Sequence, residues 1–198
     1  MYSTNNLSKV NYDLVFVDSS IEDYPVLLRG IKSDAKAFVL TDKEDGIKQI
    51  YGILSQYKNV ESIHIVAHGE PGRLFLGNAE LSLDSLEDYA GELSWFNCKA
   101  IALYGCNVAV GDAGAEFLEK LHQLTNSTIY ASSTKVGSFH KGGNWILDVC
   151  QGEKFDDFSL AFKETLLTTY SGVFATGTDG NYTFFDSQEG TKGTVTFN

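Results

Sequence analysis

Two apolar runs of the sequence end at side chains that could take part in nucleophilic catalysis. The run SIHIVAHG ends at His68 and Gly69, and the run AIALYGC ends at Cys106. Runs of this kind are typical of buried strands in a parallel sheet, whose carboxyl ends meet at the edge where open α/β folds bind ligands. The pattern therefore predicts an imidazole and a thiol at one sheet edge, with Cys106 as a nucleophile.

A nucleophile that attacks a carbonyl also needs N–H donors for the oxyanion that forms. Gly69 offers an N–H with no side chain to obstruct it, and Cys106 can offer its own N–H. Gly105 allows the backbone to turn sharply before the thiol. A simpler interpretation stays open on these residues alone: Cys106 is a small buried hydrophobe and His68 is a hydrogen-bonded turn residue.

The elements that must position these residues alternate along the chain. Strands are expected at 12–20, 37–41, 62–69, 100–106, 127–133 and 144–149, and helices at 24–31, 45–57, 82–93 and 112–124, with a further short helix within 152–169. A Pro-Gly turn within 70–81 predicts a small hairpin beside His68. This order predicts βαβ units, a mostly parallel central sheet and a three-layer α/β sandwich.

Two of these helices carry finer expectations. The helix at 82–93 is expected to begin at Ser82 or Asp84, which are residue types that cap helices. For the helix at 112–124, the periodicity predicts a buried face that includes Ala115, Phe117, Leu118 and Leu121. Asp112 is better explained as the N-cap of this helix than as a residue of the site, although it could also face the site.

Composition narrows the possible functions. The chain has 198 residues, 43% of them hydrophobic, which suits one principal core, and its net charge of -11 disfavours nucleic acid and anionic membranes as partners. Its three cysteines show no CxxC pair or zinc spacing, and we expect no metal and no cofactor. There is no apolar run long enough to span a membrane and no signal peptide is visible at the start.

The carboxyl-terminal part of the chain differs from the rest in composition. Helical periodicity stops at about Tyr170, and the remainder is rich in Gly, Thr and aromatic residues. We expect residues 1–172 to form the domain and residues 173–198 to form an extended tail or the start of a following domain. The stretch 168–186 could lie in the cleft as a strand added to the sheet edge, as peptide substrates often do.

The His-Gly and Gly-Cys blocks, together with the hairpin HGEPGRLFLGN, resemble the caspase-like cysteine peptidases. The run from about Tyr12 to Gly172, with LYGCNVAVGDAG, ASSTKVG and GGNW, more closely resembles a bacterial domain of uncharacterised function. That domain usually lies at the amino-terminal end of long, repeat-bearing surface or secreted proteins. The resemblance implies a caspase-like fold, a His68–Cys106 dyad with Gly69 as an oxyanion donor, and a secreted or cell-surface location.

The resemblance also implies a polypeptide substrate, which could be the tail or another part of the same chain. In such folds the substrate pocket is formed by loops at the same sheet edge, so Ser132, Ser133 and Thr134 are expected to border it, with Asp112 as a further candidate. A basic, Asn or Asp residue is expected at the cleavage site, and the available ones are Lys154, Lys163, Asp179, Asn181 and Asp186. Caspase specificity for aspartate is not carried over, because Cys106 is followed by Asn107 and Val108.

Two other functions remain open at this stage. The chain could be a catalytically silent module that keeps the fold and binds a peptide in the cleft, although it retains both dyad residues. It could also be a redox-sensing thiol protein, but Cys98 lies at the far end of the strand that precedes Cys106 and is poorly placed as a resolving cysteine. The sequence therefore favours a cysteine endopeptidase that processes itself or a large surface protein.

Overall fold

The computed structural model describes residues 11–176, 181–185 and 192–196 of the chain. Its strands are β1 Tyr12–Asp18, β2 Ala35–Leu40, β3 Val60–Val66, β4 His68–Glu70, β5 Arg73–Leu76, β6 Ala79–Ser82, β7 Ala100–Leu103, β8 Thr128–Ala131, β9 Val149–Gln151, β10 Asn181–Phe185 and β11 Lys192–Thr196. Its α-helices are α1 Tyr24–Gly30, α2 Gly46–Leu54, α3 Ala90–Leu93, α4 Gly111–Thr125 and α5 Glu164–Thr169. Strands β10 and β11 pair with each other as an antiparallel hairpin.

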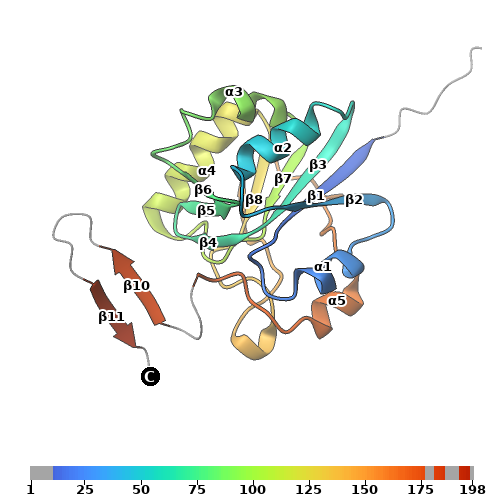
Figure 1. Ribbon diagram of the computed structural model, residues 1–198. Helices are drawn as coiled ribbons and strands as arrows, with labels where there is room; N and C mark the ends of the chain where they lie inside the picture. Colours follow the sequence, from blue (N-terminus) through green and yellow to red (C-terminus); the bar gives the residue numbers. More distant parts are fainter. Residues whose placement is uncertain (1–10, 177–180, 186–191, 197–198) are drawn as a thin grey trace, which may run out of the picture.

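The central sheet has six strands in the order β2-β1-β3-β7-β8-β9. Neighbours from β2 to β8 are parallel, and only β9 joins the sheet antiparallel, at its edge. Figure 1 shows α2, α3 and α4 on one face of this sheet and α1 and α5 on the other. The mostly parallel sheet between two helical layers confirms the expected α/β sandwich.

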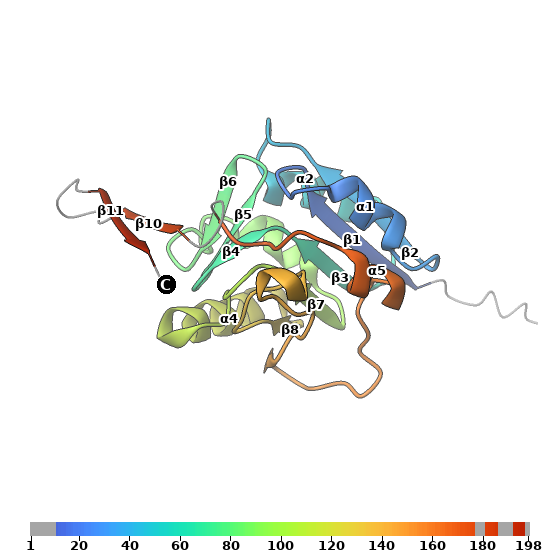
Figure 2. The same ribbon diagram turned by 90° about the horizontal axis from the view of Figure 1, so that it is seen from below.

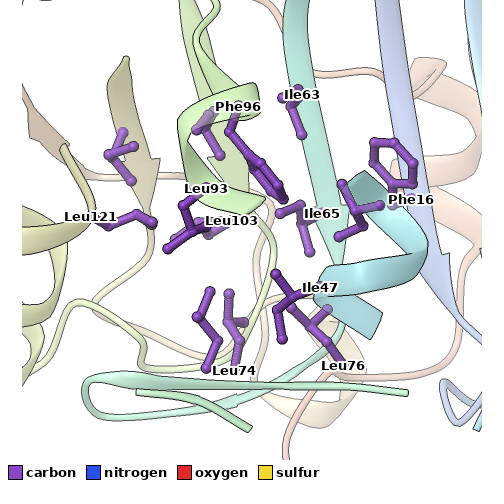
Figure 3. Close-up of a cluster of buried hydrophobic side chains, with 14 of the residues drawn as sticks. Phe16, Ile47, Ile63, Ile65, Leu74, Leu76, Leu93, Phe96, Leu103 and Leu121 are labelled. Atoms are coloured by element: carbon purple, nitrogen blue, oxygen red, sulfur yellow. The ribbon is translucent and has the colours of Figure 1, made fainter. Parts of the chain in front are cut away.

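The hairpin after β3 is also confirmed, as part of a second, smaller sheet. Strands β4, β5 and β6 pair antiparallel in that order, and His68 lies in β4 opposite Phe75. Leu74 and Leu76 point from β5 into the main core towards Ile47, as Figure 3 shows. The hairpin therefore rests on the sheet through buried leucines, which fixes the strand that carries His68.

Helix α2 packs on the central sheet in the same buried cluster as the hairpin leucines. Asp45 caps the helix by accepting hydrogen bonds from the N–H groups of Ile47, at 3.0 Å, and Lys48, at 3.2 Å. The apolar residues Ile47, Ile50 and Leu54 recur at helical spacing and are buried against the sheet. Burying side chains of this size contributes about 1.5–3 kcal/mol each.

Four expectations about local structure are wrong. No helix begins at Ser82 or Asp84; residues 83–89 form turns, and the short α3 begins at Ala90. In α4 the buried face comprises Phe117, Leu118 and Leu121 and excludes Ala115, which is exposed, and Val110 rather than Asp112 occupies the N-cap position. The sixth strand is β9, which lies largely beyond 144–149, because Trp145 packs in the buried cluster that includes Leu27 of α1 and Leu166 of α5 instead of joining the sheet.

Candidate active site

Two glycines bring the His68 and Cys106 segments together at the carboxyl edge of the sheet. A Cβ atom on Gly69 would lie only 2.8 Å from Cα of Gly105 and 2.7 Å from a methyl group of Val108. Any side chain at position 69 would therefore push β4 away from the turn that follows β7. Glycine at this position allows the two backbones to approach.

This close approach aims two backbone N–H groups at one acceptor. The N–H of Gly69 donates to the carbonyl oxygen of Phe174 at 3.1 Å, and the N–H of Cys106 donates to the same oxygen at 3.3 Å. These are the two donors that the sequence predicted for an oxyanion. Although the two residues are 37 positions apart in the sequence, the fold brings their N–H groups within hydrogen-bond reach of a single atom.

The acceptor belongs to an extended segment, residues 172–175, which we call the cleft strand. It pairs parallel to β4 through the bridge between Gly69 and Ala175, and antiparallel to residues 136–138 through the bridge between Gly137 and Val173. Figure 2 shows the chain after α5 running beside β4. Part of the stretch expected to lie in the cleft as an added strand therefore pairs with β4 and with residues 136–138 through isolated bridges, and its role as a substrate stays a prediction.

The imidazole of His68 is oriented by a backbone carbonyl. Its Nε2 atom lies 3.3 Å from the carbonyl oxygen of Ser20, which can only accept, so Nε2 carries the proton and Nδ1 carries a lone pair. Nδ1 is a buried nitrogen for which no hydrogen-bond partner exists among the described residues. Its lone pair is therefore not engaged by any described residue.

Asp18 holds the turn that presents this carbonyl. One carboxylate oxygen accepts hydrogen bonds from the N–H of Ser20 at 2.9 Å and from its hydroxyl at 2.6 Å. The other accepts from the N–H of Gly77 at 2.6 Å, on the hairpin that carries His68. Asp18 is almost fully buried and ties the turn after β1 to the hairpin that carries His68.

The thiol of Cys106 is fully buried beneath the cleft strand. The N–H of Val136 donates to its sulfur at 3.2 Å, and the sulfur lies 3.6 Å from the carbonyl oxygen of the same residue. Burial raises the pKa of the thiol to about 11, and hydrogen bonds from the Val136 and Phe174 backbones and the charge of Lys135 offset only part of that effect. With the cleft strand in place, the sulfur is therefore protonated at neutral pH.

The residues predicted to border the substrate pocket lie in the loop after β8. This loop leads into residues 136–138, which pair with the cleft strand. The carbonyl oxygens of Ser132 and Thr134 accept hydrogen bonds from the N–H groups of Ala109 and Asn107, at 3.1 and 2.9 Å. The N–H of Ser133 donates to Asp148 at 2.8 Å. These bonds support the turn behind Cys106; a direct role of the three side chains in substrate binding stays a prediction.

Two acidic residues follow His68 and Cys106 in the sequence, namely Glu70 and Asp112. Asp112 is exposed in the first turn of α4, and its role in substrate binding also stays a prediction. Glu70 is half-buried in β4, where it accepts a hydrogen bond from the hydroxyl of Thr176 at 2.6 Å. Glu70 thus contacts the chain just beyond the cleft strand.

The lysines considered as cleavage-site residues do not lie in the cleft strand. Lys154 and Lys163 are exposed, and Lys163 is the N-cap residue of α5. Asn181 begins β10, while Asp179 and Asp186 lie outside the described residues. The residue whose carbonyl meets both N–H donors is Phe174, which no motif singled out.

Other titratable groups have structural roles. His64 is buried and bonds to the hydroxyl of Ser62 at 2.9 Å and to that of Tyr104 at 3.0 Å, as expected of a core histidine. All three cysteines are free. Within residues 11–176 and the two described strands that follow, no group of His, Cys, Asp or Glu side chains could hold a metal ion, and no helix is long and apolar enough to cross a membrane.

Comparison with known proteins assigns the chain to a family. Residues 14–174 match the model of a family described as Domain of unknown function (DUF4347). The chain belongs to this family. The match includes both segments of the candidate site and ends at Phe174, whereas the boundary expected at residue 172 stays a prediction.

Solved structures are similar to this chain as well, and one of them is a protease. It is described as the X-ray structure of a secreted C11 cysteine protease from Bacteroides thetaiotaomicron in complex with an irreversible peptide inhibitor. The similarity has a TM-score of 0.41 at 14% identity and covers 63% of this chain. It covers 49% of the other chain, so this protein spans about half the length of that structure. No curated protein matches the chain.

Proposed function

We propose that this protein is a caspase-like cysteine endopeptidase in which Cys106 is the nucleophile and His68 the acid and base. The observation that carries the proposal is the carbonyl oxygen of Phe174, which accepts hydrogen bonds from the N–H groups of Gly69 and Cys106. Acyl transfer to sulfur requires two convergent donors for the oxyanion together with a thiol and an imidazole. Here one donor belongs to Cys106 itself and the other to the residue that follows His68. The substrate is a polypeptide, either this chain or a large secreted or surface protein that contains it.

In the proposed reaction, Nδ1 of His68 takes the thiol proton and the sulfur of Cys106 attacks the carbonyl carbon. The two N–H groups bind the oxyanion, and each such donor is worth roughly 3–4 kcal/mol of barrier. The imidazolium then protonates the leaving amine as the C–N bond breaks. Water hydrolyses the thioester, which releases a carboxylate and restores the thiol.

Incubation of the purified chain tests the proposal. The wild type is compared with Cys106→Ala and His68→Ala by intact-mass measurement over time, with casein as a second substrate. Cys150→Ala and His140→Ala are the matched controls, because they remove the same side chains from positions outside the site. Fragmentation that needs both Cys106 and His68 supports the proposal, whereas identical stability of all five proteins overturns it.

A catalytically silent peptide-binding module is the second candidate, and the buried thiol favours it. The sulfur of Cys106 is covered by the cleft strand, and its pKa is raised to about 11. In that case the cleft strand would be a permanent ligand. Chains that stay intact in every variant, with residues 172–175 protected from hydrogen exchange, would support this candidate over the peptidase.

A further inference from the structure

The cleft strand is bound on both sides in the manner of a substrate. On one side the N–H of Phe174 donates to the carbonyl oxygen of Val136 at 3.0 Å, and the N–H of Ser138 donates to the carbonyl oxygen of Gly172 at 2.8 Å. On the other side lies β4, which supplies Gly69. Because these bonds involve only the backbone, they fix the register of the strand and place one residue, Phe174, at the two N–H donors.

Val136 links this residue directly to the thiol. Its carbonyl oxygen accepts the hydrogen bond from Phe174, while its N–H donates to the sulfur of Cys106 at 3.2 Å. The N–H of Cys106 itself contacts the oxygen of the Phe174 carbonyl. The peptide group that follows Phe174 is therefore the one held at the backbone of Cys106.

The side chain of Phe174 fills an aromatic cage. Its ring lies 5.6 Å from that of Trp145, edge to face, and 5.7 Å from that of Tyr170, and it is fully buried. Val136 and Cys106 belong to the same buried cluster. Ring pairs of this geometry contribute about 0.5–1.5 kcal/mol beyond the area they bury.

The aromatic cage offers only apolar surface to the side chain that fills it. The indole N–H of Trp145 is used by the carbonyl oxygen of Leu167, at 3.0 Å, and the hydroxyl of Tyr170 donates to the carbonyl oxygen of Glu22, at 2.6 Å. Their polar atoms are thus occupied outside the cage, and the faces of the rings remain for Phe174. A charged side chain in this position would lose its hydration without gaining a partner.

Resting on the proposed peptidase function, we propose that the site cleaves its own chain between Phe174 and Ala175, and that its pocket for the residue before the scissile bond selects an aromatic side chain. This assignment differs from the basic, Asn or Asp residue that family resemblance suggested. The sulfur of Cys106 bonds to the carbonyl carbon of Phe174, the bond to the nitrogen of Ala175 breaks, and that nitrogen takes the proton from His68. Water then releases residues 1–174 with a free carboxylate on Phe174.

The products give a direct test. The full 198-residue chain is incubated and analysed by intact-mass and terminal-sequence measurement beside Cys106→Ala. We expect one product that ends at Phe174 and one that begins at Ala175, and neither from Cys106→Ala. Full-length Cys106→Ala, added to wild type as a substrate, is expected to stay intact at this bond, because its own cleft buries the bond.

Substitutions at the bond test the pocket. Phe174→Leu keeps an apolar side chain and is expected to cleave within about 10-fold of the wild-type rate, since a hydrophobic pocket discriminates only modestly between apolar groups. Phe174→Lys is expected to cleave at least about 100-fold more slowly, because the ammonium group has no partner in the cage. Phe139→Leu is the matched control on an exposed phenylalanine, and thermal unfolding checks that each variant is folded.

Ala175→Pro provides a variant that leaves the cage filled. It replaces the leaving amine by a tertiary amide next to an unchanged Phe174, and we expect no cleavage at this bond. If Phe174→Lys fails to fold, this variant still decides whether the bond is the scissile one.

The outcomes separate the two proposals. Cleavage that needs Cys106 but falls at another bond, or equal rates for Phe174→Leu and Phe174→Lys, overturns the assignment of Phe174 and leaves the peptidase proposal standing. A bond between Phe174 and Ala175 that stays intact in the wild type also overturns the assignment. Absence of any fragmentation that depends on Cys106, in the chain or in casein, overturns both.

Discussion

The Nε2 atom of His68 lies 3.3 Å from the carbonyl oxygen of Ser20, and this contact fixes which imidazole nitrogen can act as a base. A carbonyl only accepts hydrogen bonds, so Nε2 holds the proton and Nδ1 stays available. In the proposed enzyme, the partner that orients the histidine is therefore a backbone group and not a carboxylate. Asp18 acts on His68 indirectly, because its carboxylate holds the turn that contains Ser20.

We expect Asp18→Asn to impair catalysis through His68 as well as to reduce stability. An amide has one oxygen in place of two and cannot accept the three hydrogen bonds that Asp18 receives from Ser20 and Gly77. The loss of a buried acceptor should lower the free energy of unfolding by about 1–3 kcal/mol, measured by urea denaturation. Cleavage should slow, and its pH profile should shift, because the imidazole is less firmly oriented.

Asp42→Asn is the control for this variant, since Asp42 is an exposed carboxylate in the loop after β2. It should leave both stability and cleavage unchanged. A loss of stability in Asp18→Asn with a wild-type rate and pH profile would show that Asp18 supports the fold and not His68.

Gly69→Ala should disable the oxyanion donors. The new methyl group would meet Val108 at 2.7 Å and Cα of Gly105 at 2.8 Å, so β4 must move away from the Cys106 turn. We expect the cleavage rate to fall by roughly 100-fold or more, which is the effect of losing one oxyanion donor. The measurement is the rate of Cys106-dependent fragmentation, with labelling of Cys106 under denaturing conditions to confirm that the thiol is intact.

Gly52→Ala is the matched glycine substitution. Gly52 is exposed in α2, and a Cβ atom there meets nothing within 4 Å. Alanine should stabilise this helix by about 0.5–1 kcal/mol and leave cleavage unchanged. Equal rates for Gly69→Ala and the wild type would contradict the role of Gly69.

The sequence was sufficient to predict the sheet, the hairpin and the meeting of Gly69 with Cys106. Those features follow from apolar runs that end at polar or small residues, a pattern that parallel strands translate directly into a shared edge. The N–H groups of both residues indeed reach one oxygen atom, at 3.1 and 3.3 Å.

Ser20, Val136 and Phe174 could not be predicted as site residues, because they act mainly through backbone atoms. A backbone carbonyl has the same chemistry at every position, so no residue type marks the contact with His68 or with the thiol. Phe174 does carry a weak signal: it is an aromatic residue in a Gly-rich stretch where an exposed tail would be polar. The turns at residues 83–89 were missed for a related reason, since their apolar spacing imitates a helix that the tertiary structure does not form.

Stability should fall in mild acid because of His64. Burial lowers the pKa of His64 to about 4 from its ordinary value of 6.5, so between these values the unfolded chain binds a proton that the folded chain does not. Folding stability is therefore fully present above pH 6.5 and is lost as the pH falls towards 4, by up to about 3 kcal/mol. Urea denaturation of wild type and His64→Asn at pH 7 and pH 4.5 measures this loss.

The difference between these two proteins should shrink as the pH falls, because the asparagine does not titrate. His140→Asn, which alters an exposed histidine, should follow the wild type at both pH values. Parallel curves for the wild type and His64→Asn would mean that other groups cause the acid sensitivity.

The thiol of Cys106 should react more slowly than that of Cys150 in the uncleaved chain. Cys106 is fully buried and its pKa is raised to about 11, whereas Cys150 is partly exposed. Iodoacetamide labelling at pH 7.5, followed by peptide mapping, should modify Cys150 first, and labelling of Cys106 should accelerate as the pH rises towards 11.

The raised pKa of Cys106 also predicts that folding stability is lost between about pH 9 and pH 11, where the unfolded chain releases the thiol proton and the folded chain keeps it. Cys106→Ala should show a smaller alkaline loss than the wild type, and the remainder comes in part from Cys98, whose pKa burial raises to about 12. In the labelling experiment, rapid modification of Cys106 at neutral pH would mean that the cleft strand leaves the site readily. The thiol would then be activated before the substrate segment binds.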